Sequence, residues 1–153
     1  MAVAHLEVTS RRPFPFDYER IDGLLHFAVD PAQPANARIV DLDKAPRDAE
    51  GRVRFSADFV LLQPADARQS NRRLLAYVVN RGLRVSVPFN HGASRSTSLP
   101  PTDDIDAGDG FLMRRGWSVA MCGWQWDVER QPGLMGLNAP QALGADGQPL
   151  RGR

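Results

Sequence analysis

The clearest pattern in the chain is an alternation of apolar and polar side chains over residues 53–59. Apolar side chains occupy every second position: Val53, Phe55, Ala57 and Phe59. A period of two predicts a strand with one face on a core and the other in water, and the strand continues to Pro64. The same period predicts a strand over residues 18–29, and a shorter strand is predicted over residues 6–10.

The pattern changes after residue 70. Residues 73–79 are almost continuously apolar, which is typical of a strand covered on both faces of an α/β sheet. A helix is predicted up to Gly116, because Asp106 or Asp109 can cap its start and glycine fits the position after its end. Residues 117–123 form a second buried strand. Strand, helix and strand together indicate a βαβ unit of a parallel sheet.

We therefore predict an α/β fold in a single domain, residues 1–153. Residues 1–70 form a strand-rich, partly antiparallel region, residues 71–128 form the βαβ unit, and residues 129–153 form a Gly/Pro-rich tail with no readable core pattern. A lone βαβ unit leaves sheet edges uncovered, and the sequence supplies no further strand after Val128. We expect the sheet to be incomplete.

Composition and charge exclude several classes of protein. Apolar residues make up 42% of the chain and charged residues 24%, as in ordinary globular domains. The formal net charge is +1, so no global field favours nucleic acid or an anionic membrane. No segment has the roughly 20 apolar residues of a membrane span, and no signal peptide is recognisable. We expect a cytoplasmic protein, and the oligomeric state is not indicated.

The sequence predicts neither a metal site nor a cofactor. Cys122 is the only cysteine, and the three histidines have no ligand spacing: His5, His26 and His91. The acidic run 103–110 lacks the ligand pattern of a calcium loop, so helix capping and a solvated loop explain it better. Glycine motifs for dinucleotides or phosphates are absent.

No serine is placed as the nucleophile of a hydrolase. Residues 92–96 come nearest to the strand–Gly-x-Ser-x-Gly–helix arrangement, with Ser94 at its centre. They lack the second glycine, no strand precedes them, and two prolines follow where the helix should start. We therefore expect no catalytic residue in this chain.

Two segments follow the predicted buried strands, at the sheet edge where open α/β sheets place their ligand chemistry. Asn80, Arg81 and Gly82 are candidates for a loop whose backbone N–H groups stabilise an oxyanion. Alternatively, Gly82 permits a tight turn and Arg81 forms a structural ion pair. The second segment is the candidate wall of an apolar pocket or a roof over the core: Trp124, Gln125 and Trp126.

A resemblance extends over most of the chain from about Tyr18. It rests on segments in a fixed order, namely 23–31, 39–47, 51–59, 78–82, 111–119 and 123–127. In these segments the sequence resembles a group of bacterial proteins described as α/β-hydrolase domain-containing, which are several times longer. The resemblance implies an incomplete α/β-hydrolase-type sheet and a serine hydrolase acting on carboxylic esters or related acyl compounds. Its catalytic triad matches no position here.

Two functions remain open from the sequence. The first is an N-terminal fragment of such a hydrolase, inactive alone, whose full-length form takes a small-molecule acyl substrate. The second is a non-enzymatic, strand-rich module that binds a sugar, a peptide or a partner subunit, using the alternating strand and the pair Trp124 and Trp126. Neither predicts binding to nucleic acid or to a membrane.

Overall fold

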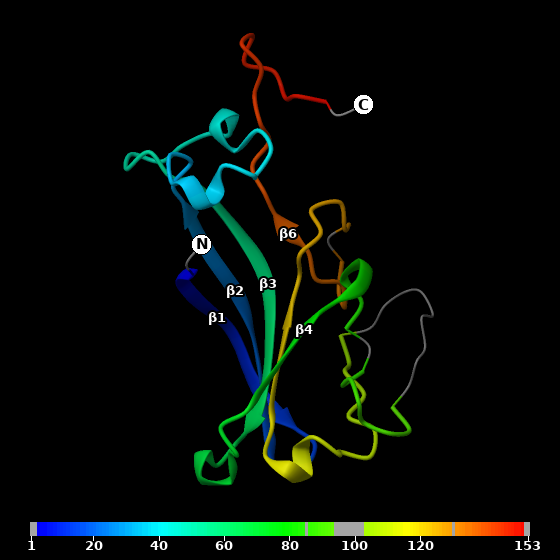
Figure 1. The fold of residues 1–153 in the computed structure, drawn as a ribbon. Coiled ribbons are helices and arrows are strands. Elements are labelled where there is room, and N and C mark those ends of the chain that lie inside the picture. The colour runs from blue at the N-terminus through cyan, green and yellow to red at the C-terminus, as the bar shows by residue number, and fades with distance from the viewer. Residues whose placement is uncertain (1–2, 85, 94–102, 130, 152–153) are drawn as a thin grey trace.

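The fold is one mixed β-sheet (Figure 1), seen in a computed structural model that describes residues 3–84, 86–93, 103–129 and 131–151. Its strands are β1 (Val3–Phe14), β2 (Tyr18–Val29), β3 (Val53–Pro64), β4 (Leu74–Val78), β5 (Ser118–Cys122) and β6 (Leu137–Asn138). They lie in the order β1-β2-β3-β5-β4, and β6 also pairs with β3. The described ranges hold no α-helix, only three-residue 3-10 turns: Pro34–Asn36, Leu42–Lys44, Ala67–Gln69, Asn80–Gly82 and Met113–Arg115.

Strands β1, β2 and β3 form an antiparallel meander. β2 has the predicted bounds, and β3 follows the predicted course, pairing with β2 from Val53 opposite Val29 to Pro64 opposite Tyr18. β1 extends beyond the predicted residues 6–10 at both ends, because pairing with β2 adds backbone hydrogen bonds that its own pattern does not reveal. It lies at the sheet edge, where a proline is tolerated.

Strands β4 and β5 are parallel neighbours, with Leu74 opposite Ser118 and Val78 opposite Cys122. The prediction that β4 is covered on both faces is wrong. Leu74 and Val78 are 58% and 59% exposed, because no described segment covers this side of β4. The apolar composition of this strand therefore does not indicate how deeply its side chains are buried.

The predicted helix over residues 106–116 is also wrong. Gly108 and Gly110 have positive φ angles of 54° and 70°, which a right-handed helix does not permit. Side chains satisfy the backbone instead: the Asp109 carboxylate accepts from the N–H of Phe111, and the amide oxygen of Asn90 accepts from the N–H of Leu112, both at 3.0 Å. Helical structure is limited to the 3-10 turn at 113–115.

These findings overturn the α/β fold class. The protein has a strand-rich mixed sheet, and the connection between its two parallel strands contains no α-helix in its described residues. The sequence pattern identified β2, β3, β4 and β5 but not β6, and paired glycines and competing side-chain hydrogen bonds prevent the crossover segment from becoming helical. The described residues do not form an α/β-hydrolase-type architecture, in which helices cover both faces of a parallel sheet.

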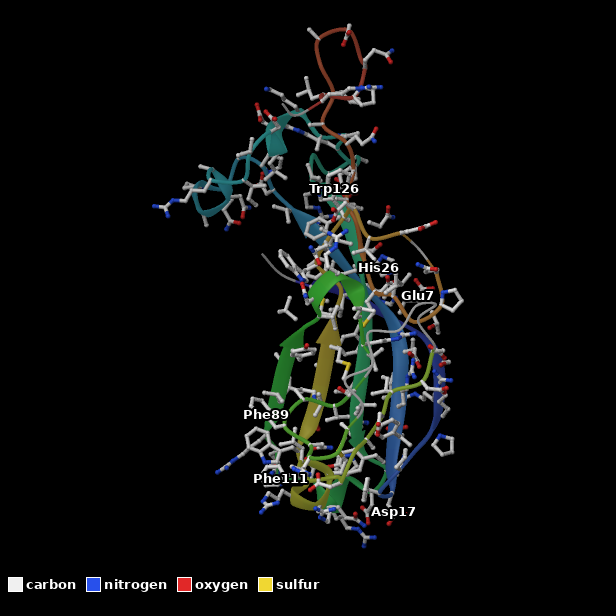
Figure 2. All side chains as sticks on the ribbon, turned by 90° about the vertical axis from the view of Figure 1, so that its right-hand side faces the viewer. Glu7, Asp17, His26, Phe89, Phe111 and Trp126 are labelled. Atoms are coloured by element: carbon white, nitrogen blue, oxygen red, sulfur yellow. The ribbon has the colours of Figure 1, made fainter. Side chains whose placement is uncertain are left out.

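Loops cover one face of the sheet and form the core with it (Figures 1 and 2). The fully buried side chains at its centre come from strands and loops alike: Val60, Leu62, Val79, Val119, Met121 and Met135. The Tyr18 hydroxyl donates towards the carbonyl oxygens of Met113 and Trp117, at 3.0 and 2.9 Å, which fixes the 3-10 turn against β2. The C-terminal region, predicted to lack a core pattern, thus contributes Met135 to the core and β6 to the sheet.

Candidate functional site

The two segments singled out from the sequence meet in the structure. Asn80–Gly82 follows β4 and residues 124–127 follow β5, so both leave the sheet at the same edge. The backbone N–H of Arg81 donates to the side-chain oxygen of Gln125 at 2.7 Å. This hydrogen bond joins the turn after one strand to the loop after the other. We call residues 80–82 and 124–127 the edge site. The name refers to the carboxyl ends of β4 and β5, not to the lateral side of β4.

Arg81 has a backbone conformation that non-glycine residues rarely adopt, with φ at 49° and ψ at 32°. Its guanidinium donates from one nitrogen to both carboxylate oxygens of Asp127, at 2.9 and 3.0 Å. Hydrogen bonding to Arg81 lowers the pKa of Asp127, against a smaller opposing effect of burial. Both side chains are about half exposed, so the ion pair contributes little to stability and remains accessible to a ligand.

Gly82 has a structural role that requires glycine. Its φ angle is 77°, and a Cβ atom added there would lie 2.7 Å from the carbonyl oxygen of Met135. The Gly82 carbonyl also accepts a hydrogen bond from the N–H of Met135 at 2.9 Å. The turn and ion-pair roles considered for Gly82 and Arg81 are therefore both present, and the Arg81 N–H proposed for an oxyanion is already bonded to Gln125.

The two tryptophans of the edge site differ in their environment. The Trp124 indole N–H donates to the carbonyl oxygen of Val79 at 2.7 Å, which holds this ring against the end of β4 while 53% of the residue stays exposed. Trp126 is 76% exposed and is labelled in Figure 2. A roof over the core is therefore ruled out for Trp126, and the edge site presents an accessible indole ring.

No described serine, threonine or cysteine side chain forms a hydrogen bond with a histidine. Ser94 lies outside them. Ser56 lies opposite His26 in the pairing of β3 with β2, but the imidazole Nε2 of His26 contacts Glu7 at 2.8 Å, and Ser56 makes no side-chain hydrogen bond. Burial, with the nearby charge of Asp58, raises the pKa of the Cys122 thiol, which keeps it in its unreactive form.

An ionic cluster that the sequence did not reveal lies on the loop-covered face. It consists of three arginines and two aspartates: Arg12, Arg20, Asp22, Arg84 and Asp103. The Arg20 side chain is only 3% exposed and contacts both carboxylates, at 2.6 and 3.0 Å. The period of two on β2 places Arg20 and Asp22 on one face, but the sequence carries no signal that Arg84 and Asp103 join them.

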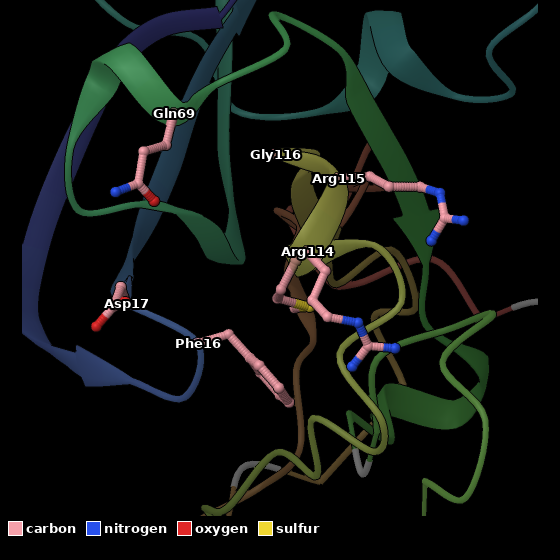
Figure 3. A pocket seen from close by; sticks show the side chains of 7 residues that line it. Phe16, Asp17, Gln69, Arg114, Arg115 and Gly116 are labelled. Atoms are coloured by element: carbon pink, nitrogen blue, oxygen red, sulfur yellow. The ribbon is translucent and has the colours of Figure 1, made fainter.

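The cluster borders a pocket of about 410 Å³. The three arginine charges are largely balanced by Asp22, Asp103 and the carboxylate of Asp58, which also lines this pocket. A second pocket, of about 470 Å³, lies beside the β1–β2 turn (Figure 3). There the guanidinium of Arg114 lies 5.9 Å from the centre of the Phe16 ring. In the first pocket the Ser10 hydroxyl donates to the Asp22 carboxylate at 3.2 Å, and the three arginines of the cluster contact this same carboxylate. The second pocket is lined by no serine, threonine or cysteine.

The structure shows no metal site among the residues that it describes. No group of three histidine, cysteine or acidic side chains there is placed to hold a metal ion. No helix there is long and apolar enough to cross a membrane. Comparison with known protein families, with curated proteins and with solved structures finds no match for this chain.

Proposed function

We propose that this domain is a non-catalytic binding module and that the edge site is its recognition surface. The exposure of Trp126 is the observation that carries the proposal. An indole ring that is three-quarters exposed leaves apolar surface in water, and tryptophan is enriched at the centres of binding surfaces. Its burial by a ligand therefore stabilises a complex.

The polar neighbours of Trp126 support the same function. Arg81 and Asp127 form an exposed ion pair, and their hydrogen bonding can be shared with a ligand. The hydrogen bond from Trp124 to Val79 and the hydrogen bond from Arg81 to Gln125 hold the surrounding loops in place before binding. A rigid frame reduces the entropy cost of binding. Sugars and peptides both combine apolar faces with hydrogen-bonding groups and match this surface.

The test is a screen of the purified domain against an oligosaccharide array and a phage-displayed peptide library. We expect a ligand whose affinity falls at least tenfold in Trp126→Ala. Phe89→Ala is the matched control, because Phe89 is also 76% exposed and lies far from Trp126 in Figure 2. The proposal is wrong if every ligand found binds Trp126→Ala as tightly as the unchanged protein.

A second candidate function is a contribution to a serine hydrolase. It is favoured by the strained backbone of Arg81 at the end of two parallel strands, because such conformations cluster at functional sites. The serine, histidine and acid would come from residues outside the edge site. If the edge site only binds, a short acyl ester is hydrolysed no faster than in buffer, and a fluorescent phosphonate does not label the protein. Stoichiometric labelling would instead support the hydrolase.

A further inference from the structure

Strand β4 has a free edge whose backbone groups can be assigned. The N–H of Ser118 donates to the carbonyl of Arg73, and the N–H of Val79 donates to the carbonyl of Cys122. In a parallel ladder, the residues that bond to the neighbouring strand alternate with residues that turn away from it. Residues 73, 75, 77 and 79 therefore face β5. The N–H and C=O groups of Leu74, Ala76 and Val78 point to the open side.

The side chains of these same three residues lie on the face of the sheet that is uncovered at β4. Leu74 and Val78 are 58% and 59% exposed, and Ala76 between them is exposed as well. Ala120 and Cys122 continue this apolar face onto β5, where they are half-buried. Edge strands of β-sheets are commonly protected from pairing by a charged residue or a proline, and β4 contains neither. In Figure 1 the described loops between β4 and β5 lie to the right of these two strands.

Positive charge without acidic partners flanks the start of this edge. Within the described ranges, neither Arg72 nor Arg73 forms an ion pair, although most other arginines there do. Arg73 instead lies 5.7 Å from the centre of the Trp117 ring. Two adjacent arginines without carboxylates attract acidic groups on whatever lies beside β4.

We propose that β4 binds an extended segment of another protein, which adds to the sheet as a strand and places acidic residues beside Arg72 and Arg73. Three outward N–H groups and three carbonyls supply the backbone pairing. Apolar side chains at alternate positions of the segment cover Leu74 and Val78. This surface adjoins the edge site but shares no residue with it, so the inference does not depend on the function proposed above.

The experiment uses a dye-labelled peptide, Glu-Glu-Val-Thr-Val-Thr-Val, and its reversed sequence, which together cover parallel and antiparallel addition. Fluorescence anisotropy measures binding to the whole 153-residue chain. We expect one of the two to bind, and its analogue with lysine in place of glutamate to bind at least tenfold more weakly. Amide exchange by NMR is expected to slow at Leu74, Ala76 and Val78 when the peptide binds.

Two variants decide the proposal. The double variant Arg72→Glu and Arg73→Glu should reverse the preference, so that the lysine peptide binds more tightly. The control Arg38→Glu should change nothing, because residue 38 lies in the loop that joins the end of β2 at Val29 to the start of β3 at Val53. Ala76→Pro removes an outward N–H without touching the ladder to β5 and should abolish binding. If Ala76→Pro does not fold, the charge reversal alone settles the question.

Other results would overturn the proposal. Absence of binding by both peptides, or equal binding of glutamate and lysine peptides, contradicts it. A dimer in analytical ultracentrifugation that Ala76→Pro disrupts would show that a second copy of this chain occupies the edge, which also contradicts it. Loss of peptide binding in Trp126→Ala would assign the peptide to the edge site. Retained binding in that variant supports β4, even if no ligand of the edge site is found.

Discussion

At the scale of single residues, the edge site depends on a close backbone approach at Gly82. The chain at Met135 passes so near that no side chain fits, and the positive φ angle independently disfavours one. Arg81, its neighbour, accepts a strained conformation and is held by Gln125 and Asp127. Local strain is tolerated here because hydrogen bonds from two loops restrict the turn.

Gly82→Ala is expected to destabilise the fold by about 2–3 kcal/mol, because the new Cβ atom meets backbone as well as an unfavourable φ angle. Gly51→Ala is the matched control. Gly51 has a similar φ angle of 76°, but a Cβ atom there meets nothing within 4 Å. Its cost should be about 1 kcal/mol, from backbone conformation alone. Urea denaturation of the two variants measures the difference, and equal costs would contradict the close-contact explanation.

At the scale of elements, the ionic cluster fastens residues 84 and 103 to the β1–β2 hairpin. Burial by itself raises the pKa of Asp103, but hydrogen bonds and charges from Arg12, Arg20 and Arg84 outweigh it, so the pKa of this carboxyl is lowered. The ionised form is thus the one that the folded protein stabilises. The contribution of Asp103 is present above its unfolded pKa of about 3.9 and is lost as the pH falls towards the lower pKa of the folded state.

Asp103→Asn should therefore lower the free energy of unfolding at pH 7 by about 1 kcal/mol, since solvent screens a carboxyl that is 43% exposed. The difference from the unchanged protein should shrink as the pH falls below about 4. Urea denaturation at a series of pH values measures it. A difference that stays constant down to pH 2 would show that Asp103 acts through packing rather than charge.

At the scale of the whole molecule, the two faces of the sheet are covered at different ends. Loops between β4 and β5 and the segment before β6 cover one face beside β4 and β5 (Figure 1). The other face is covered at its far end, where residues 39–45 and 137–142 border the buried side chains of Val29 and Val53, and it is open at β4. This asymmetry explains why residues of similar apolarity have opposite environments: Leu62 in β3 is fully buried, whereas Leu74 in β4 is mostly exposed.

These two leucines form a matched pair for a stability measurement. Leu62→Ala removes a buried side chain and should cost about 2–5 kcal/mol, whereas Leu74→Ala should cost less than about 1 kcal/mol. Thermal or urea unfolding of the isolated domain measures both. A large cost for Leu74→Ala would mean that something covers this side of β4 in solution, and it would contradict the exposure of β4.

Local sequence pattern determined four of the six strands of this protein. β2, β3, β4 and β5 lie where a period of two or an apolar run predicted them, because a strand needs only short-range alternation and β-favouring side chains. The pattern also indicated that the turn at Arg81 and the loop at Gln125 follow neighbouring strands, and the structure joins them by a hydrogen bond.

Only the tertiary structure decided what surrounds those strands. The apolar run of β4 predicted two covered faces, but burial depends on elements distant in sequence, and loops cover only one face of this strand. The helix was excluded by side chains such as Asn90, 22 residues before the N–H group that it binds. The ionic cluster likewise joins Arg20 to Asp103 across 83 residues. Local periodicity carries no information about such contacts, and these contacts set the fold class.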